Sequence, residues 1–394
     1  GGAMAGARRA ADVLVLGSGI AGASLAFELA RRGIGVTVLE AERTHSVHST
    51  GRSAALFAET YGPVGVRALT RASRDFFLTC PGTAFPRQDT PLLTKRSILW
   101  ALSAETRDLD HGLADIEGAQ EVSKADALAL CPALRDDYVC GGFVESGAMD
   151  MDVAGIQGGF VAEARRHGAE FVYDAPMKSA TRTSEGTWRV ETEAGEAYEG
   201  KIVANAAGAW AEVVARRAGL SSPVTIAPKR RTIFTFNDAQ FDDDSCLDWP
   251  FLLDARVAVH STEGAFYFKP QGRGTFIASP GDGTPTEPCD VYPDDLDIAI
   301  CIDSIMKATR FNIRSVASSW AGLRSFANDG DIVLGEAPEA PGFFYVAGQG
   351  GYGIQTAPAA AAFAADLIEH GDISDELKSF GLTAAQLSPA RFAT

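Results

Sequence analysis

Residues 13–40 read VLVLGSGIAGASLAFELARRGIGVTVLE, and this stretch decides the fold. The apolar run VLVL predicts a buried parallel strand, and the segment after it carries its apolar residues on one helical face. Between them Gly17, Gly19 and Gly22 form G-x-G-x-x-G, which permits a tight turn and lets a pyrophosphate approach the backbone. The second strand ends at Glu40, an acid placed to accept hydrogen bonds from a ribose. The stretch therefore predicts a dinucleotide site, without choosing between NAD and FAD.

The composition limits the possible partners. The chain has 394 residues, 46% of them hydrophobic, which is enough for two domains or for one domain with a large insertion. Its formal charge is -16 and no basic cluster stands out, so we expect no nucleic-acid partner. The six cysteines are scattered without metal-ligand spacing, so we expect reduced thiols, no metal site and a cytoplasmic protein. No stretch approaches the roughly 20 apolar residues of a membrane span, so no membrane partner is expected.

Two further small-residue turns follow apolar strands far along the chain. They are NAAGAW at 205–210 and GQGGYGIQT at 348–356, and each leads into a helix. Helix N-termini attract anions and polar carbonyl edges, so both turns are candidates for contact with a cofactor. An NAD dehydrogenase would complete its nucleotide domain in one contiguous block. A long cofactor touched by such distant segments favours FAD.

Seven motifs resemble, in kind and order, those of the FAD-dependent D-amino-acid oxidase superfamily. They are GSGIAG with Glu40, HSTGRSAA at 48–55, NAAGAW, PKRR at 228–231, FYFKP at 266–270, WAGLRSF at 320–326 and GQGGYGIQT. Within the superfamily, the nearest likeness is to bacterial D-arginine dehydrogenase. The resemblance implies an α/β fold: a glutathione-reductase-like, Rossmann-type FAD-binding domain with an interleaved α+β substrate domain that contains an antiparallel sheet. The predicted FAD-binding domain comprises 8–90, 142–224 and 321–394, and the substrate domain comprises 91–141 and 225–320.

The resemblance also implies a reaction and the residues that serve it. A hydride passes from the Cα of a D-amino acid to flavin N5, and the imino acid formed hydrolyses to a 2-oxo acid and ammonia. A substrate carboxylate needs a guanidinium fork in so acidic a protein. By motif match Arg324 supplies it, Tyr267 donates a phenolic hydrogen bond, and one of Arg230 and Arg231 joins them. The backbone carbonyl of Gly351 is placed to receive the substrate amine, and Tyr61 resembles the family's mobile tyrosine over the site.

The FAD site is expected to draw on several separated segments. The loop after residue 47 is expected to bind pyrophosphate and isoalloxazine edges, with His48 where the chain passes the flavin, and Gln355 is expected to contact the flavin ring or its side chain. No cysteine lies in the motifs beside the flavin, so non-covalent FAD is expected. The predicted cofactor-binding residues are Gly17, Gly19, Ile20, Ala21, Gly22, Glu40, Ala41, His48, Ser49, Thr50, Arg52, Ser53, Ala54, Ala207, Gly208, Trp210, Gly348, Gly350, Gly351, Tyr352, Gly353, Ile354 and Gln355.

The chain departs from D-arginine dehydrogenase in the region where that enzyme binds the side chain of its substrate. The segment PLLTKRSILWAL at 91–102 contains no acid to pair with a guanidinium. Leu56, Ile98, Phe251 and Leu253 instead offer apolar groups for a substrate pocket. A buried, unpaired guanidinium costs several kcal/mol. We therefore expect apolar or aromatic D-amino acids to react better than arginine or lysine.

Other functions share parts of this pattern. An oxidase or demethylase of N-methyl or other secondary amino acids would use the same carboxylate fork, as would a 2-hydroxy-acid oxidoreductase. The distant C-terminal glycine motif argues against a Rossmann dehydrogenase using NAD. Arg324, Tyr267 and Gly351 together argue against a flavoprotein whose redox activity is vestigial. The expected partners are a small amino acid or amine and an unspecified electron acceptor, and the expected state is a monomer or small homo-oligomer.

Overall fold

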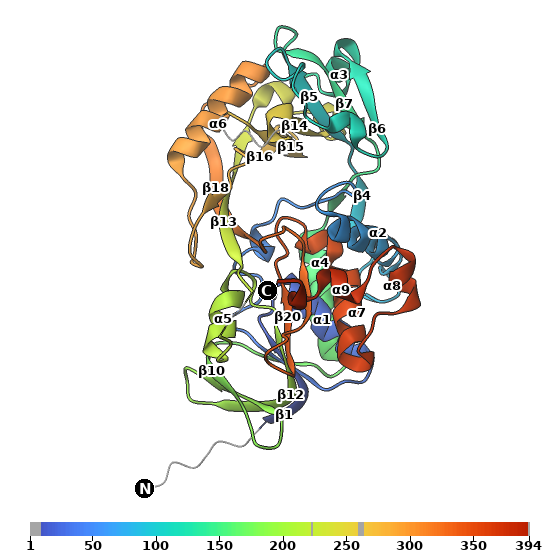
Figure 1. The fold of residues 1–394 in the computed structure, drawn as a ribbon. Coiled ribbons are helices and arrows are strands. Elements are labelled where there is room, and N and C mark those ends of the chain that lie inside the picture. The colour runs from blue at the N-terminus through green and yellow to red at the C-terminus, as the bar shows by residue number, and fades with distance from the viewer. Residues whose placement is uncertain (1–8, 222–223, 259–263, 393–394) are drawn as a thin grey trace.

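The computed structural model describes residues 9–221, 224–258 and 264–392, and Figure 1 shows them arranged in two lobes. One lobe is built on an eight-stranded sheet and the other on a nine-stranded sheet. A third, small sheet has three strands in the order β3–β8–β4, and these strands come from separate segments of the chain. Its strands are β3 (Leu56–Phe57), β4 (Leu93–Lys95) and β8 (Met149–Met151).

The eight-stranded sheet has a parallel centre. Strands β9, β2, β1, β12 and β20 run parallel, and the hairpin β10–β11 and the edge strand β19 are antiparallel to their neighbours. The carboxyl ends of parallel strands lie at one edge, so the loops after β1, β2 and β12 meet there. The strands are β1 (Arg9–Leu16), β2 (Val36–Leu39), β9 (Glu170–Val172), β10 (Met177–Arg182), β11 (Trp188–Thr192), β12 (Ala197–Asn205), β19 (Val333–Glu336) and β20 (Phe343–Ala347).

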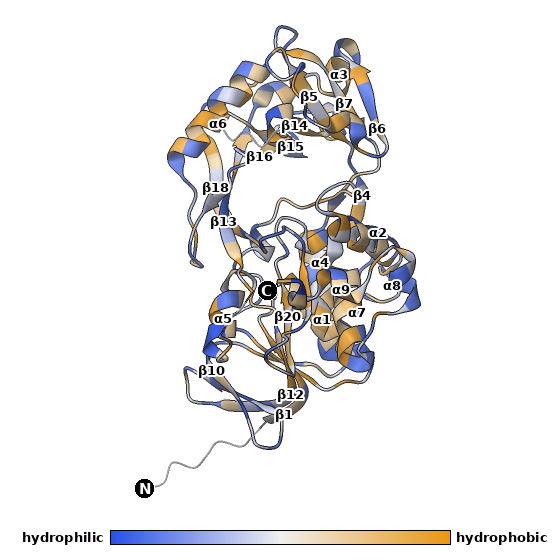
Figure 2. Cartoon of the chain, in the orientation of Figure 1, coloured by the Kyte–Doolittle hydropathy of each residue, from blue (hydrophilic) through white to orange (hydrophobic). Residues whose placement is uncertain are grey.

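Helices cover both faces of this sheet. Helices α1, α2, α4 and α7 share one apolar core with strands β1 and β2, and Phe27, Phe85 and Phe160 pack together within it. Helix α5 closes the other face. Figure 2 shows hydrophobic residues concentrated in these inner strands and in the helices beside them. The helices are α1 (Ile20–Arg31), α2 (Val64–Thr79), α4 (Val153–Arg166), α5 (Ala211–Arg217), α7 (Gly353–His370), α8 (Asp375–Ser379) and α9 (Ala384–Leu387).

The nine-stranded sheet presents one face to a core and the other to the first lobe. Leu99, Phe234 and Phe268 pack against α3 and α6 on the core face. Side chains alternate along a strand, so neighbours such as Ile98 and Tyr267 face the other way. Its elements are α3 (Lys124–Leu130), α6 (Asp295–Ala308), β5 (Ile98–Ser103), β6 (Ala119–Ser123), β7 (Val139–Glu145), β13 (Ala227–Asn237), β14 (Phe251–Asp254), β15 (Tyr267–Gly272), β16 (Thr275–Ser279), β17 (Thr284–Pro285) and β18 (Val316–Phe326).

Short 3-10 helices complete the described secondary structure. They span Thr50–Arg52, Leu113–Asp115, Gly208–Trp210, Ala239–Phe241, Asp244–Cys246, Ala255–Val257 and Pro389–Phe392. Within the three ranges that the structure describes, no helix combines the length and the apolar character that crossing a bilayer would require.

The α/β class with an additional antiparallel sheet is confirmed. The segment 91–103 forms two strands, β4 and β5, because β4 pairs with β8 whereas β5 pairs with β7 and β14. The boundaries predicted after residues 141 and 320 fall inside β7 and β18. Both strands belong wholly to the nine-stranded sheet, since their pairing partners lie there. The division into two domains stays a prediction.

Candidate functional site

The glycine loop lies between β1 and α1, where the motif placed it. Gly17 has φ +101°, and a Cβ there would lie 2.7 Å from the carbonyl oxygen of Ala206. A Cβ on Gly22 would lie 1.9 Å from the carbonyl oxygen of Gly17. No side chain caps α1 at Gly19 and no acid lies in its first turn. The helix therefore presents the positive end of its dipole at this point, where an anion is stabilised.

Glu40 fixes the loop and faces a cavity. One carboxylate oxygen accepts hydrogen bonds from the backbone N–H and the hydroxyl of Ser18, both at 2.7 Å, and the other accepts from the N–H of Glu42 at 3.0 Å. A carboxylate has about four acceptor sites, so capacity for a ribose hydroxyl remains. The expected ribose contact stays a prediction, and the structure adds a role in holding the glycine loop.

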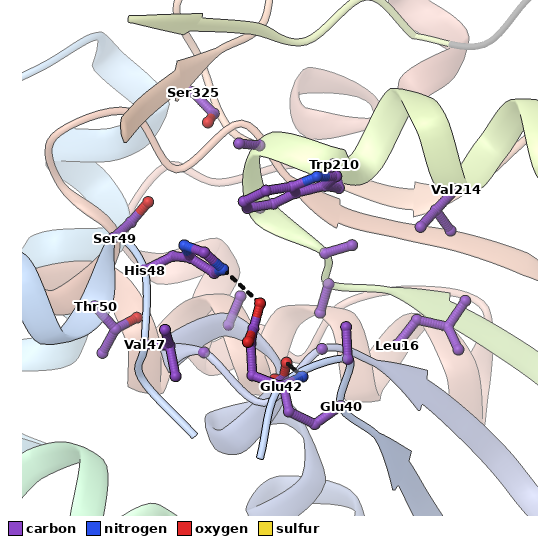
Figure 3. A pocket seen from close by; sticks show the side chains of 18 of the residues that line it. Leu16, Glu40, Glu42, Val47, His48, Ser49, Thr50, Trp210, Val214 and Ser325 are labelled. Carbon is purple, nitrogen blue, oxygen red and sulfur yellow. Dashed lines mark hydrogen bonds and ion pairs between the residues drawn. The ribbon is translucent and has the colours of Figure 1, made fainter. Parts of the chain in front are cut away.

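Two adjoining cavities share several of their lining residues. The larger of these two, of about 370 Å³, lies at the carboxyl edge of the parallel strands. Figure 3 shows His48 and Glu42 joined by a hydrogen bond, with Trp210 beside them. The His48 Nε2 to Glu42 Oε1 distance is 2.9 Å, and the rings of His48 and Trp210 are 4.6 Å apart. His48 lines this cavity and not the smaller one described next, so its placement beside the flavin end is not supported.

A smaller cavity, of about 100 Å³, continues from the larger one towards the nine-stranded sheet. The two share lining residues, which makes them one elongated space. The shared residues are Ile20, Ser49, Thr50, Leu323, Gln349 and Gly350. Here the hydroxyl of Thr50 accepts from the N–H of Ile20 at 3.0 Å, and that of Ser49 donates to the carbonyl of Leu323 at 2.6 Å.

Two arginines, two tyrosines and a glycine come together beside the smaller cavity. The Arg231 guanidinium carbon lies 5.9 Å from the centre of the Tyr267 ring. A Cβ on Gly351 would lie 3.0 Å from Cζ of Arg324 and 2.7 Å from the hydroxyl oxygen of Tyr61. The structure thus brings together residues from β13, β15, β18, the 58–61 segment and the turn before α7.

The structure separates the two arginines that the sequence could not. Arg231 lies on the cavity face of β13 and lines the smaller cavity. Arg230 points to the other face, where it pairs with Asp297 at 2.6 Å and with Asp282 at 3.4 Å. The inclusion of Arg230 in the site is therefore not supported, because consecutive side chains of a strand point in opposite directions.

The charges of this site are incompletely compensated. Arg324 forms no ion pair within the described ranges. Nε of Arg231 lies 3.8 Å from a carboxylate oxygen of Asp282, and this buried nitrogen has no hydrogen-bond partner among the described residues. Burial and the neighbouring Arg324 lower the pKa of Arg231. Burial alone would raise the pKa of Tyr267, but the two guanidiniums outweigh it and lower that pKa. The arrangement is suited to binding an anion.

Some predicted cofactor residues have protein partners instead. The Gln355 amide bonds to the backbone of Ala58 and to Thr70, although it lines the smaller cavity. The guanidinium of Arg52 bonds to Asp290 at 2.5 Å and to three backbone carbonyls, which leaves it little capacity for a phosphate. The hydroxyl of Tyr352 donates to a backbone carbonyl. Three predicted residues line neither cavity: Gly22, Gly348 and Tyr352.

Sequence reasoning missed several residues that line the cavities. They come from a hairpin, a helix and neighbouring strands, and include Glu42, Ala175, Met177, Val214, Arg217, Ile233, Leu323, Ser325 and Gln349. Gln349 and Leu323 lie within motifs already singled out, so considering every residue of those motifs would have found them. For Met177 and Arg217 no local signal exists, since the sheet topology brings them to the cavity.

The four predicted pocket residues gather beside Tyr267. Ile98 and Phe251 pack with Tyr267 in one small apolar cluster, Leu56 and Leu253 pack against it, and the rings of Phe251 and Tyr267 are 5.2 Å apart. Segment 91–102 itself carries no acid, as the sequence shows, but a neighbouring strand brings one close to Ile98. Glu145 of β7 lies directly opposite Ile98 and is only 6% exposed. The sequence argument considered one strand, whereas the neighbouring strand supplies a carboxylate.

A family model described as FAD dependent oxidoreductase (DAO) matches residues 12–367. The chain belongs to this family. Glycine oxidase of Geobacillus kaustophilus is 25% identical over 396 residues, covering 94% of this chain and 96% of that protein. Human mitochondrial dimethylglycine dehydrogenase is 26% identical over 226 residues, covering 54% of this chain and only 25% of that longer protein.

Solved structures share the DAO-family fold. The glycine oxidase of G. kaustophilus has a TM-score of 0.75 and 21% identity, covering 95% of this chain and 99% of that one. L-proline dehydrogenase of P. horikoshii has a TM-score of 0.76 and 19% identity, covering 98% and 99%. The narrower likeness to D-arginine dehydrogenase stays a prediction.

The residues of the site fit FAD, the cofactor of the family. The glycines at the start of α1 suit a pyrophosphate, with Thr50 occupying only the N–H of Ile20, and the elongated space runs from Glu40 to Arg324. When bound, FAD would supply the oxidising chemistry, and the residues of the larger cavity would hold its adenosine and those of the smaller one its flavin. None of the described residues lining either cavity is a cysteine, and non-covalent binding stays a prediction.

Proposed function

We propose that this protein oxidises α-amino acids at the bond between Cα and nitrogen, with Arg324 and Arg231 holding the substrate carboxylate. One observation carries the proposal: two partly buried guanidiniums line the smaller cavity without adequate anionic partners, and Nε of Arg231 is buried without a hydrogen bond. Because buried charges are normally paired, a carboxylate entering this space supplies the missing acceptor. The protein carries a formal charge of -16, so attraction of an anion must come from such local cations.

Each site residue has a defined task in this proposal. Arg324 offers a planar fork to both carboxylate oxygens, and Tyr267 donates its hydroxyl hydrogen to one of them. The carbonyl of Gly351 accepts from the substrate amine, which orients Cα. Tyr61 covers the carboxylate and helps to exclude water. When bound, FAD would supply the two-electron oxidation at Cα, and the imino acid released would hydrolyse in water to a 2-oxo acid and ammonia.

The substrate side chain is proposed to be apolar. Leu56 lines the smaller cavity, and Ile98, Phe251 and Leu253 pack with it in the apolar cluster beside Tyr267, so a leucine-like or phenylalanine-like group would meet apolar contacts there. The carboxylate of Glu145 already accepts two hydrogen bonds from protein groups, so it is less available than an unbonded carboxylate to pair with a cationic substrate side chain. The D configuration rests on the resemblance of the motifs to D-amino-acid oxidising enzymes.

A second candidate is oxidation of N-methyl or other secondary amino acids. Dimethylglycine dehydrogenase is among the relatives by sequence, and iminodiacetate oxidase from Chelativorans sp. BNC1 among those by fold. The same carboxylate site serves these substrates. A 2-hydroxy acid would also fit the carboxylate site, but it offers the Gly351 carbonyl a hydroxyl in place of a charged amine.

Product analysis separates these functions. We expect purified holoprotein to release ammonia from D-leucine faster than methylamine from N-methyl-D-leucine, with L-leucine as the stereochemical control. Faster methylamine release would favour the second candidate. No turnover of any amino acid, with 2-hydroxy acids oxidised instead, would contradict the proposal.

A further inference from the structure

The segment that carries Tyr61 is tied to both lobes. On one side, the side chain of Gln355 in α7 bonds to the N–H of Ala58 at 3.1 Å and to its carbonyl at 3.3 Å. On the other side, the hydroxyl of Thr60 donates to a carboxylate oxygen of Glu145. A short bridge between α7 and β7 therefore fixes residues 58–61.

Glu145 is an unusual partner for such a bridge. It ends β7, opposite Ile98 of β5, and is 6% exposed. Besides the Thr60 hydroxyl it accepts the indole N–H of Trp100 at 2.6 Å, and within the described ranges it forms no ion pair. Burying a carboxylate without a cation is unfavourable, but hydrogen bonds to a charged acceptor are among the strongest in proteins. The two donors therefore hold this carboxylate firmly, and it holds them.

Tyr61 depends on this bridge for its place. Its side chain is at the mouth of the site, 41% exposed, and its hydroxyl lies against Gly351 and near Arg324. Among the described residues that hydroxyl has no hydrogen-bond partner, and the ring contacts Tyr352 with a centroid distance of 5.8 Å. The backbone of the segment 58–61, rather than a bond from the hydroxyl, therefore sets where Tyr61 lies.

We propose that Glu145 is a positioning residue that acts through Thr60 to hold Tyr61 over the anion site. The inference rests on the proposed function in assigning a carboxylate to Arg324 and Arg231. When the bond between Thr60 and Glu145 is present, Tyr61 closes the site. When that bond is lost, the segment keeps its attachments to the first lobe, through Gln355 and through the ion pair of Glu59 with Arg74 at 2.9 Å, but loses its tie to β7, and the closed arrangement is less populated.

The test uses FAD-loaded protein and benzoate, a carboxylate that is not turned over. Thr60→Val removes the donor at nearly constant shape, and Thr60→Ser keeps it. Glu145→Ala removes the acceptor, and Glu145→Gln keeps an acceptor of lower strength. Glu121→Gln is a matched control, because Glu121 is exposed on the neighbouring strand β6. Hydrogen exchange of the peptide covering residues 58–62 provides a readout that needs no ligand.

We expect Thr60→Val and Glu145→Ala to weaken benzoate binding by about tenfold, with Glu145→Gln between them and wild type. Thr60→Ser and Glu121→Gln should match wild type, and exchange of residues 58–62 should accelerate only in the first three variants. In a Tyr61→Ala background, Thr60→Val should have no further effect on benzoate. Unchanged exchange in Thr60→Val, or fully additive effects with Tyr61→Ala, would overturn the inference.

The proposed function can fail separately. If the variants behave as expected with benzoate while no amino acid is oxidised, then Glu145 positions Tyr61 over an anion site of another purpose. If amino acids are oxidised but exchange and benzoate affinity are the same in all variants, the inference about Glu145 fails alone.

Discussion

Arg324→Met should weaken carboxylate binding strongly without destabilising the protein. Arg324 is partly buried beside the smaller cavity and forms no ion pair within the described ranges. Burial opposes its charge, whereas the neighbouring Tyr61 and Tyr267 favour it, and together they leave its pKa raised. Replacing an unpaired buried charge by an apolar side chain removes a desolvation cost, so the free energy of unfolding should stay the same or rise.

The size of the binding loss follows from the geometry of the fork. A guanidinium donates up to two parallel hydrogen bonds to one carboxylate. Each hydrogen bond to a charged group contributes about 1.5–3 kcal/mol, so the pair contributes roughly 3–6 kcal/mol. A loss of that size weakens the dissociation constant by roughly 100-fold or more, because about 1.4 kcal/mol corresponds to a factor of ten.

The assay is a titration of holoprotein with benzoate and with its neutral analogue benzamide, followed by flavin absorbance. Wild type should prefer benzoate, and Arg324→Met should lose that preference. Arg230→Met is the matched control, since Arg230 lies on the opposite face of β13 in ion pairs with Asp282 and Asp297. It should lower stability yet keep benzoate affinity within about threefold. Equal loss in Arg230→Met, or unchanged binding in Arg324→Met, would refute the reasoning.

Further predictions concern pH, the cofactor and stability. Two guanidiniums hold the pKa of Tyr267 below its ordinary value of about 10. The neutral phenol donates to the carboxylate and the phenolate competes with it, so benzoate affinity should fall as the pH rises through that lowered pKa, and Tyr267→Phe should abolish this fall. Glu40→Gln should weaken FAD binding to apoprotein by about tenfold, measured by flavin fluorescence, because the charged acceptor for Ser18 is lost. Gly158→Ala in α4 meets open space and should stabilise by about 0.5–1 kcal/mol, whereas Gly159→Ala would place its Cβ 2.3 Å from a phenyl ring and should destabilise by roughly 1–3 kcal/mol in denaturant unfolding. Destabilisation by Gly158→Ala together with stabilisation by Gly159→Ala would contradict the packing.

The nucleotide end of the site could be predicted because its determinants are local. Gly17, Gly19 and Glu40 lie within one strand–turn–helix–strand unit, and the spacing of the glycines sets the turn by itself. The fold class could also be predicted, because the later motifs follow in the order typical of the family. The boundaries between the segments of the two sheets were predicted less accurately. Strand β18, for example, belongs to the nine-stranded sheet because it pairs with β13, which lies about ninety positions earlier in the chain.

The substrate end depended on contacts that no local pattern encodes. The choice between Arg230 and Arg231 required the register of β13 against β18, which decides the face of each side chain. Glu145 was missed because it reaches the pocket through pairing of β7 with β5. Gln355 lies in the predicted turn, yet its amide is committed to Ala58, a contact made across nearly three hundred residues.

The central claim is that the buried guanidiniums serve oxidation of an amino acid by the bound flavin. Its most direct test is anaerobic mixing of holoprotein with D-leucine or with D-2-hydroxy-4-methylpentanoate, whose side chain is the same, while flavin absorbance is recorded. We predict that D-leucine bleaches the flavin and that Arg324→Met slows this by roughly 100-fold at subsaturating substrate. Bleaching by the hydroxy acid alone, or equal bleaching of wild type and Arg324→Met by D-leucine, would contradict the claim.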